Sequence, residues 1–402
     1  MEAEGIAIVG AGQAGAALAA RLRHKGYDGA ISIYGAEPAA PYQRPPLSKK
    51  YLGSDWGAER LQLRPAGFWR DNEIELCLGA PVAMIDPELG HLIWNGELRR
   101  WNKLALTTGT APRPLPPELA GRANAYELRT IADVDRLRPA FQPGRRLVVI
   151  GGGYIGLESA AVAARAGLTV TLIERAPRIL ERVACTETAE AIRHLHRSHG
   201  VEIREGRGIA AIHGAGRIDA IELDDGSRID CDLAIVGIGV TPQTGLAAAA
   251  GLRCDNGILV DGFGRTSAPG VWAAGDCASF TLDGQVTRLE SVQNAIDQAE
   301  AVADDMLGMG APYRPVPWFW SDQFDAKLQI VGLNRGYDRV VTHDGARGQS
   351  IWYFRHDRLL AVDAINDPRA YMTAKKLLEA GRTVTPAEID RPDFEPMQLL
   401  RG

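Results

Sequence analysis

The sequence has few cysteines and no local pattern among them. Cys77, Cys185, Cys231, Cys254 and Cys277 are widely scattered, and no CxxC or CxxxxC spacing occurs. Neither a metal knuckle nor a dithiol redox centre is therefore encoded locally, and we expect no metal site. These cysteines are expected to be small, buried apolar residues.

Long apolar runs, a basic leader and a positive net charge are also missing. No stretch approaches the roughly 18 apolar residues that a membrane helix needs. The first ten residues, MEAEGIAIVG, carry two acids and no basic leader, unlike a secretory signal. A net charge of −5 disfavours general binding to nucleic acid, which depends on many cationic contacts. We therefore expect a cytoplasmic protein without a membrane or nucleic-acid partner.

The composition is that of a compact enzyme. With 402 residues the chain is too long for one hydrophobic core, so two or three domains are expected. Hydrophobic residues make up 46% and charged residues 24%, which leaves no room for a large disordered fraction. We expect a monomer.

The clearest motif lies near the middle of the chain. An apolar run at 147–150 is followed by Gly151-Gly152-Gly153-Tyr154-Ile155-Gly156, a helical stretch and a second strand that ends at Glu174. This order predicts a strand, a glycine turn and a helix whose N-terminus holds a pyrophosphate. Glu174 stands 18 residues after Gly156, where a carboxylate meets an adenosine ribose. Because that acid would repel a 2′-phosphate, we expect NADH rather than NADPH, although the adjacent Arg175 softens the preference.

A second copy of this pattern begins near the N-terminus. The apolar run at 6–9 is followed by Gly10-Ala11-Gly12-Gln13-Ala14-Gly15 and a helical stretch. The next strand is followed by Ala36 and Glu37, so the acid comes about two residues late. Two such units about 140 residues apart predict an enzyme that holds FAD in one site and binds NAD in the other.

Further motifs make the resemblance specific. They are PYQRPPLSK (41–49), LALTTGTAPR (104–113), GGGYIGLE (151–158), LAIVGIGVTP (233–242), TSAPGVWAAGDCA (266–278) and PWFWSDQF (317–324). From about residue 5 to about residue 370, the chain resembles the FAD-dependent, NADH-using ferredoxin reductases that serve bacterial oxygenases. The resemblance implies hydride transfer from NADH to noncovalently bound FAD. It also implies single-electron transfer to a [2Fe–2S] ferredoxin that feeds a cytochrome P450 or a ring-hydroxylating oxygenase.

The resemblance also implies roles for individual residues. The FAD contacts that it implies are Gly10, Gly12, Ala14 and Gly15 at the pyrophosphate, Glu37 at the ribose, Arg44, Lys49 close to the flavin ring, Val82, Arg129, Asp276 at the ribityl or pyrophosphate part, and Val292 near the flavin. The NAD contacts are Gly151, Gly153, Gly156 and Glu174, with Glu158 beside the nicotinamide. Lys49 and Glu158 are thus the expected catalytic residues. The family often carries a further acid where this chain has Ala36, so the ribose contact would depend on Glu37 alone.

The order of the motifs predicts an α/β fold with two Rossmann-like dinucleotide-binding domains and a smaller α+β C-terminal domain. The FAD domain is expected at residues 1–112 and 243–312, the NAD domain at 113–242, and the C-terminal domain at 313–402. Four arginines are candidate docking cations for an acidic ferredoxin: Arg64, which matches a basic position of the family, Arg70, Arg335 and Arg339. Trp318 and Trp320 are equally candidates for an apolar docking contact and for core packing.

Two other functions remain open. Disulfide reductases and NADH peroxidases share the plan of two nucleotide domains, but they need a redox cysteine beside the flavin. Residues 1–76 contain no cysteine. A flavoprotein in which NADH binding drives a signalling interaction, as in relatives of apoptosis-inducing factor, is the second alternative, and slow acceptor turnover would favour it.

Overall fold

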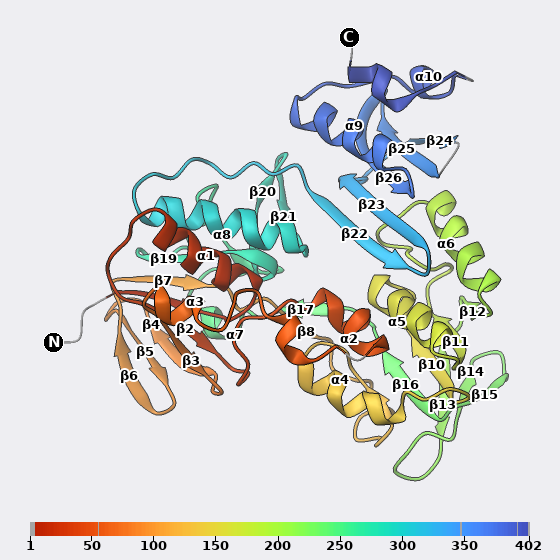
Figure 1. Ribbon diagram of the computed structural model, residues 1–402, viewed down its shortest axis with the longest axis horizontal. Coiled ribbons are helices and arrows are strands. Elements are labelled where there is room, and N and C mark those ends of the chain that lie inside the picture. The colour runs from red at the N-terminus through yellow and green to blue at the C-terminus, as the bar shows by residue number, and fades with distance from the viewer. Residues whose placement is uncertain (1–4, 55, 346–347, 392, 401–402) are drawn as a thin grey trace. The chain divides into compact units, whose positions relative to one another are not determined.

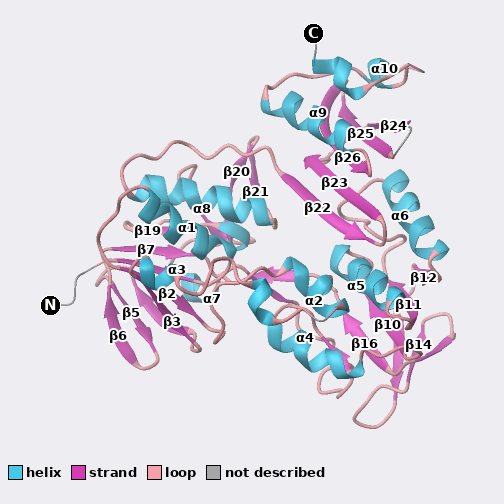
Figure 2. Cartoon of the chain, viewed as in Figure 1, coloured by secondary structure: helices cyan, strands magenta, loops and turns pink. Residues whose placement is uncertain are grey.

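The computed structural model describes residues 5–54, 56–345, 348–391 and 393–400. The chain divides into two compact units, each assembled from three segments. The first unit comprises Met1–Arg44, Gly57–Ala111 and Val240–Pro315, and the second comprises Pro45–Trp56, Pro112–Gly239 and Val316–Gly402. Figure 1 follows the chain through both units by colour, and Figure 2 shows the alternation of helices and strands.

The first unit is built on a parallel sheet with strand order β19-β7-β1-β2-β3. Its strands read as apolar runs because a parallel sheet is covered on both faces. The sheet strands are β1 (Ile6–Val9), β2 (Ile31–Gly35), β3 (Ile74–Leu78), β7 (Lys103–Leu106) and β19 (Val271–Ala273). The other strands are β4 (Val82–Asp86), β5 (His91–Trp94), β6 (Glu97–Arg100), β8 (Thr110–Pro112), β17 (Val240–Pro242), β18 (Ile258–Leu259), β20 (Ala278–Leu282) and β21 (Gln285–Thr287). The helices are α1 (Gln13–His24), α3 (Phe68–Asp71), α7 (Gly245–Ala249) and α8 (Val292–Met306).

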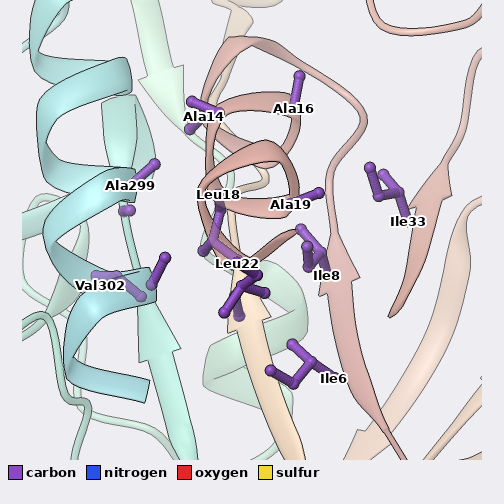
Figure 3. Close-up of a cluster of buried hydrophobic side chains, with 14 of the residues drawn as sticks. Ile6, Ile8, Ala14, Ala16, Leu18, Ala19, Leu22, Ile33, Ala299 and Val302 are labelled. Atoms are coloured by element: carbon purple, nitrogen blue, oxygen red, sulfur yellow. The ribbon is translucent and has the colours of Figure 1, made fainter. Parts of the chain in front are cut away.

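Helix α1 packs against both the sheet and α8, although the two helices are far apart in sequence. Figure 3 shows Leu18 and Leu22 of α1 among Ile8 of β1 and Val302 of α8, and all four are buried. Alanines at several α1 positions let the two helices approach closely. The segment that returns after residue 240 therefore completes the core that the N-terminal segment begins.

The second unit contains another parallel sheet, with strand order β12-β11-β10-β16-β9. Its strands are β9 (Ala125–Tyr126), β10 (Arg146–Ile150), β11 (Thr169–Glu174), β12 (Glu202–Glu205) and β16 (Leu233–Val236). A small antiparallel sheet of β13 (Ile209–His213), β14 (Ala220–Leu223) and β15 (Arg228–Asp230) accompanies it. The helices of this part are α2 (Lys50–Gly53), α4 (Ile131–Leu137), α5 (Tyr154–Arg165) and α6 (Thr186–Ser198).

The C-terminal part of the second unit is an antiparallel sheet with order β22-β23-β26-β25-β24. Its alternating aromatic residues supply buried rings such as Trp352 and Phe354. The strands are β22 (Trp318–Gln323), β23 (Ala326–Gly332), β24 (Arg339–Asp344), β25 (Gln349–Arg355) and β26 (Arg358–Ile365), followed by α9 (Pro368–Glu379) and α10 (Pro386–Ile389).

The expected fold class is confirmed: two Rossmann-like parallel sheets and a smaller α+β C-terminal part are present. The three domain ranges stay a prediction. In the structure, the C-terminal sheet clusters with residues 112–239, and the segment Pro45–Trp56 joins the same unit rather than the one that holds β1.

Candidate functional site

In the first glycine loop, Gly10 and Gly15 are tightly packed against the backbone, whereas Gly12 faces open space. A Cβ atom on Gly10 would lie 2.1 Å from the carbonyl oxygen of Thr107, and one on Gly15 would lie 2.0 Å from that of Gly10. A Cβ on Gly12 would meet no described atom within 4 Å. Gly12 is the N-cap of α1, so this open face borders the first-turn N–H groups. Crowded outer glycines and an open central one fit a pyrophosphate that approaches the backbone.

The second glycine loop repeats this geometry in the other unit. A Cβ on Gly151 would lie 2.3 Å from the carbonyl oxygen of Gly237, and one on Gly156 would lie 2.1 Å from that of Gly151. At Gly153, the N-cap of α5, a Cβ would again find no described neighbour within 4 Å. Both loops therefore fit a dinucleotide, each on its own unit.

Glu174 ends β11 and is fixed by the backbone around the second loop. Its Oε2 atom accepts from the N–H of Gly152 at 2.6 Å, and its Oε1 atom accepts from the N–H of Ala176 at 2.7 Å. The carboxylate is thus held beside the glycine loop. Its ribose role stays a prediction.

Glu37 follows β2 and is engaged within its own unit. Its Oε1 atom lies 2.5 Å from Nη2 of Arg44, and its Oε2 atom accepts from the hydroxyl of Tyr42 at 2.6 Å. The guanidinium of Arg44 also lies over the ring of Tyr42, 5.0 Å from its centroid. Two residues that were expected to contact FAD separately are therefore an ion pair in this structure, and Tyr42 orients both.

The AAGD motif reaches the first glycine loop. A Cβ on Gly275 would lie 3.0 Å from that of Ala14, the second residue of α1. The N–H of Gly275 donates to Oε1 of the buried Gln298 at 2.9 Å. Asp276 is half-buried, and its carbonyl accepts from Arg288 at 3.0 Å. Gln298 has no signal of its own in the sequence, since Gly275 becomes its neighbour only when α8 packs. Arg288 has none either, because its contact with Asp276 forms only when β21 pairs with β20.

Lys49 and Glu158 form a shielded ion pair in the second unit. Nζ of Lys49 lies 3.1 Å from Oε1 of Glu158, which also accepts from the hydroxyl of Ser321 at 2.7 Å. The other oxygen, Oε2, accepts from Ser48 at 2.7 Å. Burial raises the pKa of Glu158, while Lys49 and the two hydroxyls oppose that rise. Sequence reasoning missed both serines, although each lies inside a quoted motif.

The other expected contact residues are placed as follows. Val82 begins β4 and is half-buried against an apolar cluster of the first unit. Val292 is the first residue of α8. Arg129 lies in the second unit, where its backbone N–H donates to Asp133 at 3.1 Å. Their cofactor contacts stay predictions.

The described cysteines are free thiols. Cys77, Cys185, Cys231 and Cys277 are buried, and Cys254 is exposed. Burial raises the pKa of Cys77 and of Cys231 to about 12, so these thiols stay protonated. Within the described ranges, no group of acidic, histidine or cysteine side chains is arranged to hold a metal ion. None of the described helices is both long and apolar enough to span a bilayer.

A groove of about 690 Å³ lies on the first unit, between α1, α3 and α8. Arg64 lines it, is exposed, and lies over the ring of Phe68 at 5.1 Å. Two other arginines of the groove are already engaged: Arg21 by Asp304 at 2.7 Å, and Arg23 by backbone carbonyls. Among the described residues Arg64 has no carboxylate within 4.0 Å, so its charge is available to a partner.

The other docking candidates lie elsewhere. Arg70 is 84% exposed and pairs with Asp71 at 3.0 Å. Arg335 and Arg339 are exposed and belong to the second unit. Trp318 and Trp320 are half-buried on β22, with ring centroids 5.7 Å apart.

Comparison with known proteins decides the family. The model described as pyridine nucleotide-disulphide oxidoreductase matches residues 5–299, and the one described as reductase C-terminal matches residues 318–400. The chain belongs to the pyridine nucleotide-disulphide oxidoreductase family. It is 43% identical over 394 residues to the ferredoxin–NAD(P)+ reductase fdr of Sphingomonas sp., with 96% of this chain and 95% of that protein covered.

Solved structures of the family agree. The putidaredoxin reductase in a covalent complex with putidaredoxin has a TM-score of 0.95 at 37% identity, with coverage of 99% and 98%. The ferredoxin reductase of the CYP199A2 system of Rhodopseudomonas palustris also has a TM-score of 0.95, at 38% identity and coverage of 98% and 99%. The expected resemblance to bacterial ferredoxin reductases is therefore confirmed. As a pyridine nucleotide-disulphide oxidoreductase, the chain is an oxidoreductase that uses a flavin and a pyridine nucleotide.

Proposed function

We propose that this oxidoreductase is an NADH-dependent ferredoxin reductase with noncovalently bound FAD. It would serve a [2Fe–2S] ferredoxin of a cytochrome P450 or ring-hydroxylating oxygenase system. The observation that carries the proposal is the pair of glycine loops, one on each unit, whose central residues Gly12 and Gly153 face open space.

The cofactors supply the redox chemistry when they are bound: hydride transfer from nicotinamide to flavin, then release of electrons one at a time. The protein binds and orients them, and no general base is required. Gly10, Gly12, Ala14 and Gly15 with Asp276 hold the FAD pyrophosphate region. Gly151, Gly153 and Gly156 hold that of NADH. Glu158, kept ionised by Lys49, Ser48 and Ser321, supplies a fixed negative charge beside the nicotinamide.

The preference for NADH rests on Glu174. Two backbone N–H groups fix its carboxylate beside the second loop, so it cannot easily swing away from a ribose. A 2′-phosphate would face this charge. For FAD, we propose that Glu37 and Arg44 act as a pair at the adenosine end.

A ferredoxin partner is supported by the relatives, among which is a reductase solved in complex with putidaredoxin. The uncompensated charge of Arg64 suits an acidic surface. We propose a cytoplasmic location, in keeping with widely scattered cysteines of which four are buried. We propose that it acts as a monomer.

The decisive experiment is NADH oxidation followed with and without purified [2Fe–2S] ferredoxins, with a rubredoxin as the comparison acceptor. We expect rapid bleaching of the flavin by NADH and catalytic reduction of at least one [2Fe–2S] ferredoxin. Rapid bleaching without turnover of any protein acceptor would favour a nucleotide-sensing flavoprotein. Turnover of disulfides or peroxide that a single cysteine replacement abolishes would favour the disulfide reductase alternative.

A further inference from the structure

A row of buried polar side chains leads away from Glu158 into the second unit. The hydroxyl of Ser321 donates to Oε1 of Glu158 at 2.7 Å, and Nε2 of Gln323 donates to Oγ of Ser321 at 3.1 Å. Oε1 of Gln323 lies 2.8 Å from Nε2 of His196. The exposed fractions of Glu158, Ser321, Gln323 and His196 are 5%, 0%, 1% and 0%. The row therefore joins α5, β22 and α6 without access to solvent.

The row has a single direction of hydrogen bonding. An ionised Glu158 only accepts, so the proton of Ser321 points to it, and Oγ of Ser321 must accept from the amide NH₂ of Gln323. The amide oxygen then accepts, which assigns the proton of His196 to Nε2. Burial lowers the pKa of His196 to about 4, so the ring is neutral and Nδ1 is a bare acceptor. Nδ1 has no hydrogen-bond partner among the described residues, so no acceptor there competes for the proton.

Burial of these three polar side chains costs free energy unless they are hydrogen-bonded, and the bonds between them fix one arrangement. All their donations run toward one carboxylate. Because Gln323 donates to the hydroxyl oxygen of Ser321, the hydroxyl hydrogen points to Glu158 and is donated to its carboxylate. Together with Ser48 on Oε2, this hydroxyl fixes the rotation of the carboxylate.

We propose that Ser321, Gln323 and His196 are positioning residues that keep Glu158 ionised and fixed in orientation for the nicotinamide. The assignment deepens the proposed function and rests on it. The ionisable groups around Glu158 are Lys49 at 3.1 Å, Asp322, which lies 3.9 Å from Lys49, and Tyr154. Burial raises the pKa of Tyr154 well above its ordinary value, so that phenol stays neutral.

The test interrupts the row at two points, with Ser321→Ala and Gln323→Leu. Ser350→Ala is the matched control, because Ser350 is also a fully buried serine of the same sheet, and its hydroxyl accepts from Trp352 instead. Ser321→Thr keeps the hydroxyl and serves as the rescue. For each protein, kcat and KM for NADH with ferricyanide are measured across pH 5–9, and NAD+ binding is measured by calorimetry over the same range. The ¹⁵N spectrum of His196 is recorded without nucleotide.

Loss of a donor to a charged group raises its pKa, so the acid limb of kcat/KM should move up by about one to two pH units in Ser321→Ala. Gln323→Leu should move it less in the same direction, with KM affected more than kcat, and NAD+ affinity should follow the same shift. Ser350→Ala and Ser321→Thr should keep the parent profile. His196 should be neutral with its proton on Nε2, and Gln323→Leu should change that ¹⁵N signal.

Unchanged profiles in both interrupting variants, or an equal shift in Ser350→Ala, would overturn the proposal. So would a proton on Nδ1 of His196. If Ser321→Ala does not fold, Gln323→Leu decides, because Gln323 acts on the carboxylate only through Ser321. Failure of the parent protein to oxidise NADH would instead refute the proposed function, and the ¹⁵N spectrum would still test the hydrogen-bonded row.

Discussion

The ammonium group of Lys49 lies 3.1 Å from Oε1 of Glu158, and their side chains are only 17% and 6% exposed. The free-energy cost of removing both charges from water must be offset by their mutual attraction and by hydrogen bonds, which Ser48 and Ser321 supply. The presence of this pair at the glycine-motif helix α5 places a fixed charge pair in the part of the chain that we propose binds NADH.

Removal of one partner should destabilise the protein more than removal of both. Lys49→Met leaves an uncompensated buried carboxylate and should lower the free energy of unfolding by about 3 kcal/mol. The double variant Lys49→Met/Glu158→Leu should recover most of this loss. Urea unfolding at pH 7 provides the measurement, and Lys50→Met, at the exposed neighbouring lysine, is the control. Equal effects of the two lysine variants would show that the pair is not energetically coupled.

Glu174 should set the preference for NADH. Glu174→Ala should narrow the gap in kcat/KM between NADH and NADPH by about 1–3 kcal/mol, the scale of one charge-assisted contact or repulsion. Glu190→Gln, on the exposed face of α6, is the charge-matched control. Equal use of both nucleotides by the unmodified enzyme would be incompatible with the assignment.

Activity should not depend on any cysteine. Thiols held protonated by burial cannot act as redox nucleophiles, and this applies to Cys77 and Cys231, each with a pKa of about 12. Replacement of all five by Ala should retain NADH-driven ferredoxin reduction, with about 1 kcal/mol of stability lost at each buried position. A folded single variant that lost electron transfer would revive the disulfide-type mechanism.

Ferredoxin docking should depend on Arg64. Arg64→Glu should raise KM for ferredoxin and leave NADH oxidation with a small neutral quinone unchanged. Ferredoxin reduction should also fall steeply from low to moderate salt, because charges are screened over about 10 Å at 0.1 M. Arg70→Glu is the comparison, since Arg70 already has a partner in Asp71. A neutral Arg64→Glu variant together with a flat salt dependence would rule out electrostatic docking at this groove.

The stability of the protein should respond to a second buried acid, Asp363. Burial raises its pKa to about 6, although hydroxyls of Tyr353 and Thr188 donate to it. A raised carboxyl pKa contributes stability that is fully present below the ordinary value of 3.8 and is lost as the pH rises through about 6. Relative to Asp363→Asn, the parent should therefore lose about 2 kcal/mol of unfolding free energy between pH 4 and pH 7. His196 titrates in both proteins, so its opposite dependence cancels in the difference. Urea unfolding at both pH values measures it, and a constant difference would contradict the prediction.

Local sequence patterns predicted the fold, whereas the details of the site depend on contacts between residues that are distant in sequence. The two strand–glycine–helix units could be predicted because each is contained in a stretch of about 30 residues, so its apolar periodicity and glycine spacing are visible in the sequence. The partners of Glu158 could not, since Ser48 and Ser321 lie 110 and 163 positions away in sequence. The contact of His196 with Gln323 spans 127 positions, and neither residue belongs to a spacing pattern. The pairing of Glu37 with Arg44 was also missed, because each residue was assigned a separate ligand contact.

The interrupted first unit has a consequence for synthesis on the ribosome. Strand β19 and helix α8 belong to the core begun by β1 and α1, yet they emerge only after residues 112–239 have been made. In the nascent chain, the side of α1 that contacts α8 therefore stays uncovered until α8 has been synthesised. The parallel sheet of the second unit can form before that point. A chain truncated before residue 306 should therefore be prone to aggregation. During synthesis, this side of α1 must be covered by α8 once it is made, or by a chaperone until then.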